Sequence, residues 1–195
     1  MRWWTVIELK VPGDRLISFM EYEEMRKDSD ERLEYVDGVV YMSPPPRTRH
    51  QRISVKLSAK LFSLLDGTGC EVLTAPYDIE LAGGEKDEQP TVIIPDLSVI
   101  CDQSGFTDQR YIGTPDLIIE IVSPSNQSYD LIFKTNLYQK NKVKEYWIVN
   151  PILDNIMVYT LDENDQYCLV ENEKEGIVKS RIIEGFEVDV QAIFN

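Results

Sequence analysis

Glu120 is an acidic residue inside an otherwise apolar stretch, Asp116-Leu117-Ile118-Ile119-Glu120-Ile121-Val122, which is followed by Ser123-Pro124. The short, almost continuous run of Leu, Ile and Val is typical of a buried strand, and a proline cannot continue its hydrogen-bond ladder. An ionised carboxylate in such a strand is costly unless it is paired, hydrogen-bonded or bound to a metal. Glu120 is therefore expected to meet a partner in the fold.

Two other stretches carry residues that could meet Glu120. Upstream, Asp96 lies in a second apolar run, Val92 to Ile100, which is also predicted to be a strand. Downstream, a helix is predicted from Ser128 to about Lys140, and Asp130, Lys134 and Tyr138 lie on one face of it at successive i, i+4 positions. Two carboxylates and one lysine at the edge of a sheet can form a metal-dependent phosphodiesterase site. Asp96, Glu120 and Lys134 are the candidate catalytic residues.

Each of these residues also has a purely structural interpretation. A Pro-Asp pair such as Pro95-Asp96 is often a turn or a strand end, and Glu120 could form an inert buried ion pair with Lys134. Asp116 shares the strand parity of Glu120 but lies at the strand entrance, where we expect it to be solvated. Asp130 could cap its helix or help to hold Lys134.

Composition predicts one globular domain. The chain has 195 residues, of which 43% are hydrophobic, and this suits a single substantial core. No apolar run approaches the ~20 residues that a membrane-spanning helix needs. The sequence also has no signal-peptide core, so we expect a cytoplasmic protein without a membrane partner. Three widely spaced cysteines without a CxxC pair predict reduced structural thiols, at Cys70, Cys101 and Cys168.

The charge distribution argues against a simple nucleic-acid binder. The net charge is −14, whereas affinity for phosphate usually comes from Lys and Arg. Half of this excess negative charge lies in an acidic C-terminal extension, residues 154–195, which has ten acidic and three basic residues. A local basic strip lies at a predicted helix start, where the guanidinium groups of Arg47, Arg49 and Arg52 could contact phosphate. His50, in the same strip, is a possible additional site residue and could also contact phosphate. An ordinary solvated helix turn is the alternative.

The order of predicted elements indicates an α/β or α+β domain with a mixed central sheet. Ser18 and Glu21 form a capping-box pattern for a short helix, and Asp37-Gly38 predicts a hairpin over residues 33–42. A longer helix is predicted from about Thr48 to Leu65. Its apolar stripe consists of Ile53, Leu57, Leu61, Leu64 and Leu65. Further strands are expected at residues 3–11, 145–149, 156–161, 166–170, 177–180 and 186–190.

An ordered set of motifs resembles the Uma-type family of restriction-endonuclease-like proteins, within the PD-(D/E)XK nuclease superfamily. The motifs cover roughly residues 15–160, which we take as the domain core. They are Leu33-Glu34-Tyr35-Val36-Asp37-Gly38, Met42-Ser43-Pro44, His50, Pro95-Asp96, Glu120-Ile121-Val122-Ser123-Pro124-Ser125, Asp130, Lys134, Tyr138 and Glu145-Tyr146-Trp147.

The resemblance implies a central mixed sheet flanked by helices, with a magnesium-dependent nuclease site at one edge and manganese as a substitute ion. It maps the metal-binding acids onto Asp96 and Glu120. The superfamily lysine usually stands two residues after the second acid, but that position is Val122 here, and the family pattern points to Lys134 instead. Glu34 could be a further acid of the site or a solvent-facing strand residue.

The leading functional hypothesis is a magnesium-dependent endonuclease that acts on DNA, with a homodimer expected by analogy with superfamily nucleases. The alternative is a non-catalytic binding or regulatory module that acts through a protein partner, and the charge of −14 favours it. A hydrolase with a Ser or Cys nucleophile has little support, because there is no GxSxG-type elbow and the only histidine, His50, has no nucleophile beside it in sequence.

Overall fold

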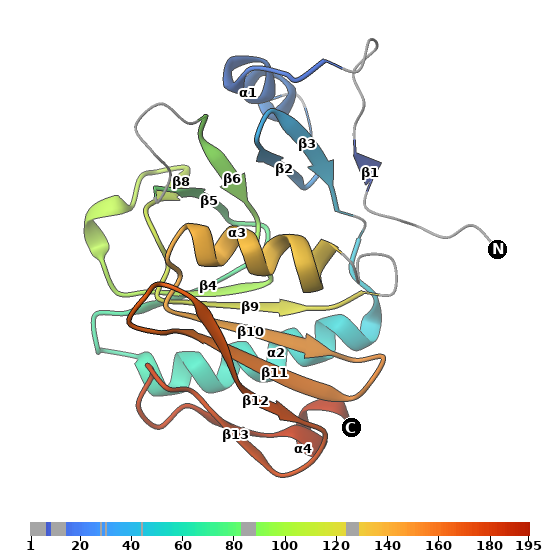
Figure 1. Cartoon of the computed structure of the whole chain (residues 1–195), viewed down its shortest axis with the longest axis vertical. Coiled ribbons are helices and arrows are strands. Elements are labelled where there is room, and N and C mark those ends of the chain that lie inside the picture. The colour runs from blue at the N-terminus through green and yellow to red at the C-terminus, as the bar shows by residue number, and fades with distance from the viewer. Residues whose placement is uncertain are drawn as a thin grey trace, which may run out of the picture.

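The computed structural model describes residues 7–8, 15–27, 29, 31–43, 45–82, 89–123 and 129–195, with side chains given from residue 15 onward except at 129 and 130. Within these ranges the strands form two six-stranded sheets and one two-stranded sheet. Helices cover the sheets, as Figure 1 shows, so the predicted mixed α+β fold with flanking helices is confirmed.

The main sheet holds the predicted Glu120 strand near its centre. Its strand order is β12-β11-β10-β9-β7-β4. The β9 and β10 strands are parallel and the other neighbours are antiparallel, which makes the sheet mixed. The strands are β4 (Glu71–Thr74), β7 (Leu97–Ile100), β9 (Leu117–Ile121), β10 (Glu145–Asn150), β11 (Asn155–Leu161) and β12 (Tyr167–Glu173).

Two helices pack on opposite faces of the main sheet. The long helix α2 (Thr48–Leu65) and the C-terminal elements β13 (Ile177–Lys179), β14 (Glu187–Asp189) and α4 (Val190–Phe194) share one apolar core with Ile119 and Ile121 of β9. Helix α3 (Lys134–Lys140) packs on the other face, against Ile118 and Val122. Alternating side chains of β9 therefore enter two different cores, because successive residues of a strand point to opposite faces.

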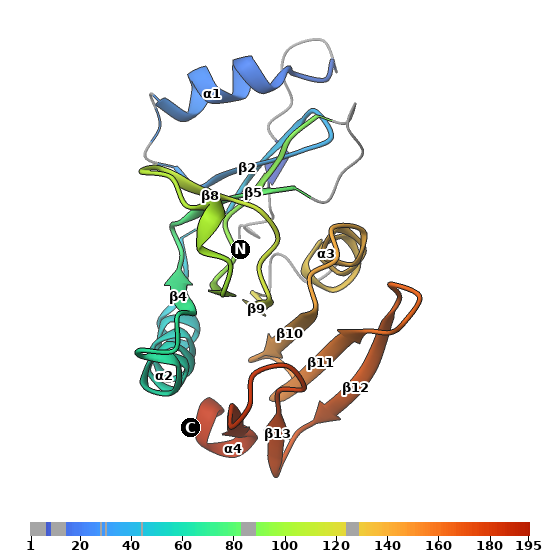
Figure 2. The same ribbon diagram turned by 90° about the vertical axis from the view of Figure 1, so that its left-hand side faces the viewer.

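The second sheet, which we call the upper sheet, has the order β1-β3-β2-β6-β5-β8. One of its apolar sides packs on α1 (Phe19–Lys27) through Tyr22 and Tyr35, whose rings are stacked 5.0 Å apart. Figure 2 shows α3 between the upper sheet and the main sheet. The strands are β1 (Ile7–Glu8), β2 (Leu33–Val36), β3 (Val39–Met42), β5 (Asp78–Leu81), β6 (Thr91–Ile93) and β8 (Arg110–Ile112).

Local sequence signals for turns and caps are confirmed. The Ser18 N–H donates to Glu21 Oε2 at 2.8 Å and the Glu21 N–H donates to Ser18 Oγ at 3.3 Å, which is the predicted capping box at the start of α1. The β2–β3 hairpin turns at Asp37 and Gly38, both with positive φ, as the two-residue turn requires.

Three predicted features of the chain differ from the structure or lie outside its described part. The predicted strand Val92 to Ile100 is two strands, β6 and β7, which belong to different sheets. Pro95 separates them because it has no N–H to give to a ladder. Of the residues predicted for the apolar stripe of α2, Leu64 is 37% exposed, whereas the other four are buried. Most of the predicted opening strand and the Ser128 cap lie outside the described residues; a π-helix, η2 (Tyr129–Phe133), leads into α3.

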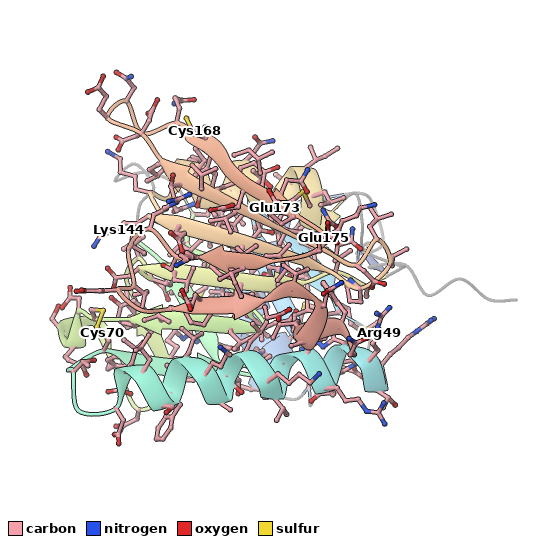
Figure 3. All side chains as sticks on the ribbon, turned by 90° about the horizontal axis from the view of Figure 1, so that it is seen from below. Arg49, Cys70, Lys144, Cys168, Glu173 and Glu175 are labelled. Atoms are coloured by element: carbon pink, nitrogen blue, oxygen red, sulfur yellow. A yellow bond between two sulfur atoms is a disulfide. The ribbon has the colours of Figure 1, made fainter. Side chains whose placement is uncertain are left out.

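The prediction of three reduced cysteines is wrong for two of them. Cys70 and Cys101 form a disulfide, and Cys168 is free and exposed (Figure 3). The pairing follows from strand register: Glu71 lies opposite Ile100 in the β4–β7 ladder, so the residues just beyond, Cys70 and Cys101, come face to face. The sequence separation of 31 residues did not reveal this register.

Thiol labelling tests this pairing. We expect alkylation of the folded, unreduced chain to modify Cys168 alone, because the other two sulfur atoms are bonded to each other. After denaturation and reduction, all three cysteines should react. Peptide mass spectrometry that found Cys70 or Cys101 alkylated without reduction would contradict the disulfide.

The buried face of α2 should carry a large share of the stability of the main core. Leu57 is fully buried there, so Leu57→Ala should lower the free energy of unfolding by about 3 kcal/mol through lost burial and a cavity. The control is Gln51→Ala, an exposed position of the same helix, for which we expect a change within about 0.5 kcal/mol. Urea denaturation measures both; equal effects would contradict the packing of α2.

None of the helices in the described part of the chain is both long and apolar enough to cross a membrane.

Candidate active site

Lys134 is the point at which distant parts of the chain meet. Its ammonium donates to Glu120 Oε1 at 2.7 Å and to Glu34 Oε1 at 3.2 Å. Lys134 begins α3, Glu120 lies in β9 of the main sheet, and Glu34 lies in β2 of the upper sheet. All three side chains are at most 5% exposed. The lysine therefore connects the two sheets through buried ion pairs.

Glu120 accepts a second strong hydrogen bond from α3. The Tyr138 hydroxyl donates to the same Oε1 atom at 2.6 Å, one helical turn after Lys134. Burial raises the pKa of Glu120, the Lys134 ammonium partly offsets this, and the charges of Asp96 and Glu34 add to the increase. Burial and the charge of Glu120 also raise the pKa of Tyr138 well above its ordinary value, so the hydroxyl remains a donor.

Asp96 lies immediately before β7 and next to Glu120. Continuing the antiparallel register by one step beyond the Leu97–Ile119 pair brings Asp96 opposite Glu120. Its Oδ2 accepts the Ile121 N–H and His50 Nε2–H, each at 2.9 Å. Burial alone would raise the pKa of Asp96, but these two hydrogen bonds and nearby positive charge hold it below its usual value.

The contact between His50 and Asp96 connects α2 to the site. His50 is near the start of α2, and in the part of the chain that the structure describes its Nδ1 is buried without a hydrogen-bond partner. The sequence indicated His50 as a possible additional site residue but did not reveal its pairing with Asp96, since the two residues are 46 positions apart. The Tyr138–Glu120 bond was also missed, although the i, i+4 spacing from Lys134 indicated where Tyr138 would point.

The other candidate residues have varied surroundings. Glu34 is 1% exposed and its Oε1 also accepts the Ile94 N–H at 2.9 Å, so it is a buried site neighbour and not a solvent-facing residue. Asp116 lies at the entrance of β9, where it pairs with Lys144 at 2.6 Å. Asp130 lies in η2, but its side chain is outside the described residues.

The three arginines of the basic strip differ in what they contact. Arg49 pairs with Asp154 at 2.7 Å, donates to carbonyl oxygens of Pro151 and Phe194, and so holds the start of α2 to the C-terminal region. Arg47 is the exposed N-cap residue of α2, and Arg52 is exposed one turn further on. Neither of these two forms an ion pair with any residue that the structure describes.

The acids of the site suit a divalent cation of the magnesium class. Two buried carboxylates, Glu34 and Glu120, pair with the ammonium of Lys134, and a third, Asp96, lies near enough for its charge to act on the pKa of Glu120. Among the residues that the structure describes, the hydrogen bonds to Asp96 go to Oδ2 and those to Glu120 go to Oε1, which leaves Oδ1 and Oε2 for other ligands. Over the described ranges no group of three or more His, Cys, Asp or Glu could hold a metal ion, but magnesium needs only one or two carboxylates.

Comparison with known proteins places the chain among relatives of matching length. A family model described as Uma2, "Putative restriction endonuclease", matches residues 19–191. A curated protein of Synechocystis that has no described function is 28% identical over 174 residues, which cover 88% of this chain and 87% of that protein.

A solved structure shares the fold. It is a crystal structure of a "putative nuclease belonging to DUF820" from Anabaena variabilis, with a TM-score of 0.69 and 16% identity over 88% of this chain and 96% of that one. Because the Uma2 model matches most of the chain, from α1 to the last helix, the protein belongs to the Uma2 family of restriction-endonuclease-like proteins.

Proposed function

We propose that this protein is a magnesium-dependent endonuclease that hydrolyses phosphodiester bonds of DNA. The observation that carries the proposal is the convergence of Asp96, Glu120 and Lys134 from three separate elements onto one buried cluster, in a chain of the Uma2 family. A lysine beside two acids suits phosphodiester hydrolysis, because a fixed positive charge can stabilise the negative charge that develops on the phosphate oxygens in the transition state.

Asp96 and Glu120 would hold the cation, through Oδ1 and Oε2. When bound there, Mg²⁺, or Mn²⁺ in its place, would lower the pKa of a coordinated water and stabilise charge on the reacting phosphate. The presence of three buried carboxyl groups beside one lysine supports this assignment, because buried charges are stable when they are paired or coordinate a metal. His50 and the Ile121 N–H would fix the orientation of Asp96 through Oδ2.

Lys134 would act as the electrostatic catalyst. Glu34 and Glu120 fix its ammonium in one place, and Tyr138 keeps Glu120 oriented from the same helix. A fixed positive charge of this kind can position a nucleophilic water or stabilise the phosphate in the transition state without reorganisation. Arg47, exposed at the start of α2 and three residues before His50, would contact the DNA backbone.

Plasmid cleavage tests the proposed activity. We expect the chain to nick or linearise supercoiled DNA in Mg²⁺ or Mn²⁺ and not in EDTA, and we expect Glu120→Ala to abolish cleavage. Glu187→Ala, which removes an exposed carboxylate paired with Lys179, is the control and should cleave normally. Absence of cleavage with either ion would refute the proposed activity and favour the non-catalytic alternative that the charge of −14 supports. Equal cleavage by Glu120→Ala would exclude the proposed site.

A further inference from the structure

The outer face of α2 carries an apolar stripe that no other described part of the chain covers. Val55 is 63% exposed and Phe62 is 62% exposed, although both are large hydrophobic residues. Together with Arg52, Ala59 and Asp66 they form a series in which successive residues are three or four positions apart. All five residues therefore lie along one side of the helix, opposite its buried face. Figures 2 and 3 both show α2 at the periphery of the molecule.

The stripe is complementary to itself. Arg52 and Asp66 lie at its two ends, each seven residues from Ala59, and neither forms an ion pair with a described residue. If two copies of α2 lie antiparallel across a two-fold axis at Ala59, Arg52 of each copy faces the partner's Asp66, and Val55 packs beside the partner's Phe62. Ala59 at the axis has a small side chain, so the two helices can approach closely.

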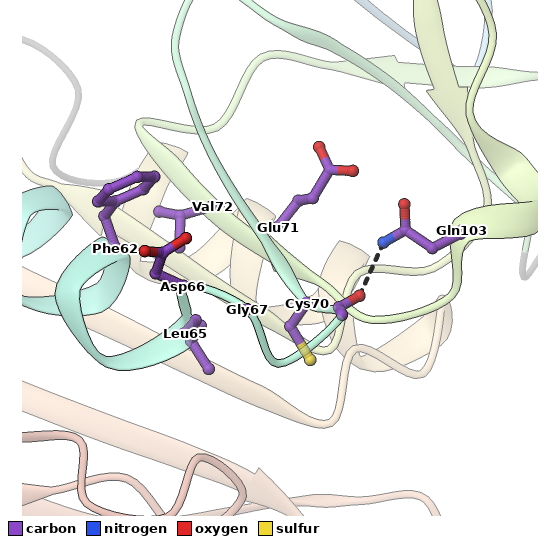
Figure 4. Close-up of a pocket in the computed structure, with 9 residues that line it drawn as sticks. Phe62, Leu65, Asp66, Gly67, Cys70, Glu71, Val72 and Gln103 are labelled. Carbon is purple, nitrogen blue, oxygen red and sulfur yellow. Dashed lines mark hydrogen bonds between the residues drawn. The ribbon is translucent and has the colours of Figure 1, made fainter.

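A cavity adjoins the acidic end of the stripe and extends this complementarity. It has a volume of about 490 Å³ and opens beside the C-terminal end of α2, with Phe62, Asp66 and Glu71 in its lining (Figure 4). Glu71 is exposed on β4 and, like Asp66, has no ion pair among the described side chains. A guanidinium that entered from the partner would meet two carboxylates beside an aromatic ring, an environment that suits arginine.

We propose that this face, defined by Arg52, Val55, Ala59, Phe62 and Asp66, binds a second copy of the same chain in an antiparallel, two-fold arrangement. Closed two-fold dimers use the same patch on both copies, which is what a self-complementary stripe provides. A single helix pair buries less than the ~1,600 Å² of a standard interface, so we expect a dissociation constant in the micromolar range, about 1–100 μM. The two candidate active sites would lie at opposite ends of the pair, because the His50 residues are about 27 Å apart along the helix axes.

Sedimentation equilibrium of the full chain tests the proposal independently of nuclease activity. We expect a monomer–dimer equilibrium for the unmodified chain at about 150 mM salt, and at least a tenfold weaker dimer for Phe62→Glu and for Val55→Glu. Met20→Glu places the same charge on an exposed apolar residue of α1 and should leave association unchanged. A chain that stays monomeric at 1 mM, or a dimer that Phe62→Glu does not weaken, would overturn the proposal.

Charge exchange and cross-linking test the antiparallel register. Arg52→Glu and Asp66→Arg should each weaken the dimer, and the double variant should associate more tightly than either single one. In a Cys168→Ser background, Ala59→Cys should form an intermolecular disulfide under mild oxidation, whereas Met20→Cys should not. Additive weakening in the double variant, or equal cross-linking at positions 59 and 20, would overturn the two-fold axis at Ala59.

Discussion

Replacing Lys134 by methionine should lower the rate of DNA cleavage by about 10²–10³-fold, because it removes the fixed positive charge from the site. Methionine keeps an unbranched chain that can fill most of the space of the lysine stem. The substitution leaves Glu34 and Glu120 without their ammonium partner, so the free energy of unfolding should also fall by about 3 kcal/mol.

The measurement is single-turnover cleavage of a labelled duplex at saturating Mg²⁺, with circular dichroism to confirm that the variant is folded. The matched control is Lys144→Met, which removes the same charge from an exposed lysine that pairs with Asp116. It should cleave at the rate of the unmodified chain and lose less than about 1 kcal/mol of stability. A folded Lys134→Met variant that cleaves at the full rate would exclude the catalytic role of this lysine.

Magnesium should stabilise the folded chain through Asp96 and Glu120. A ligand that binds only the native state at 100 times its Kd adds about 2.7 kcal/mol, which corresponds to a rise of about 5–10 °C in Tm for a domain of this size. Glu120→Gln should remove most of this rise, because the amide keeps the shape and an acceptor for Lys134 but loses the negative charge that attracts the cation.

Thermal unfolding with and without Mg²⁺ measures the effect, with the same scans for Asp116→Asn as the control. Asp116 is a carboxylate at the other end of β9, so its replacement should leave the magnesium-dependent rise intact. If Glu120→Gln and the unmodified chain gain the same stability from Mg²⁺, the cation binds elsewhere.

Local signals in the sequence were sufficient to predict much of the fold. The capping box at Ser18, the Asp37-Gly38 turn and the stripe of α2 depend on contacts between residues close in sequence, and the structure has all three features. The almost continuous apolar run around Glu120 also predicted a buried strand correctly. Such elements are determined by turn geometry and hydrophobic periodicity, both of which can be read from a short window.

Features that depend on register between distant strands could not be predicted in this way. The Cys70–Cys101 disulfide requires the pairing of β4 with β7, and the division of residues 92–100 between two sheets depends on how the chain turns at Pro95. A one-residue change of register would reverse the direction of every side chain in a strand, and the sequence of one strand does not fix its partner.

For the site, the types of residue were predictable and their connections were not. Glu120 and Lys134 could be paired because they lie 14 residues apart on neighbouring elements. The contact between Glu34 and Lys134 spans 100 residues and joins two sheets, so only the folded chain reveals it. The pairing of His50 with Asp96 was likewise hidden, since the sequence alone did not show that the start of α2 approaches β7.

The most direct test of the proposed site is a crystal structure of the chain soaked in Mn²⁺, with anomalous scattering measured at the manganese edge. We expect one strong anomalous peak that is coordinated by Asp96 and Glu120, with Lys134 Nζ nearby and not coordinated. A site without anomalous signal at saturating Mn²⁺, or a peak bound to other residues while Glu120 keeps only its contacts to Lys134 and Tyr138, would contradict the assignment of these acids as metal ligands.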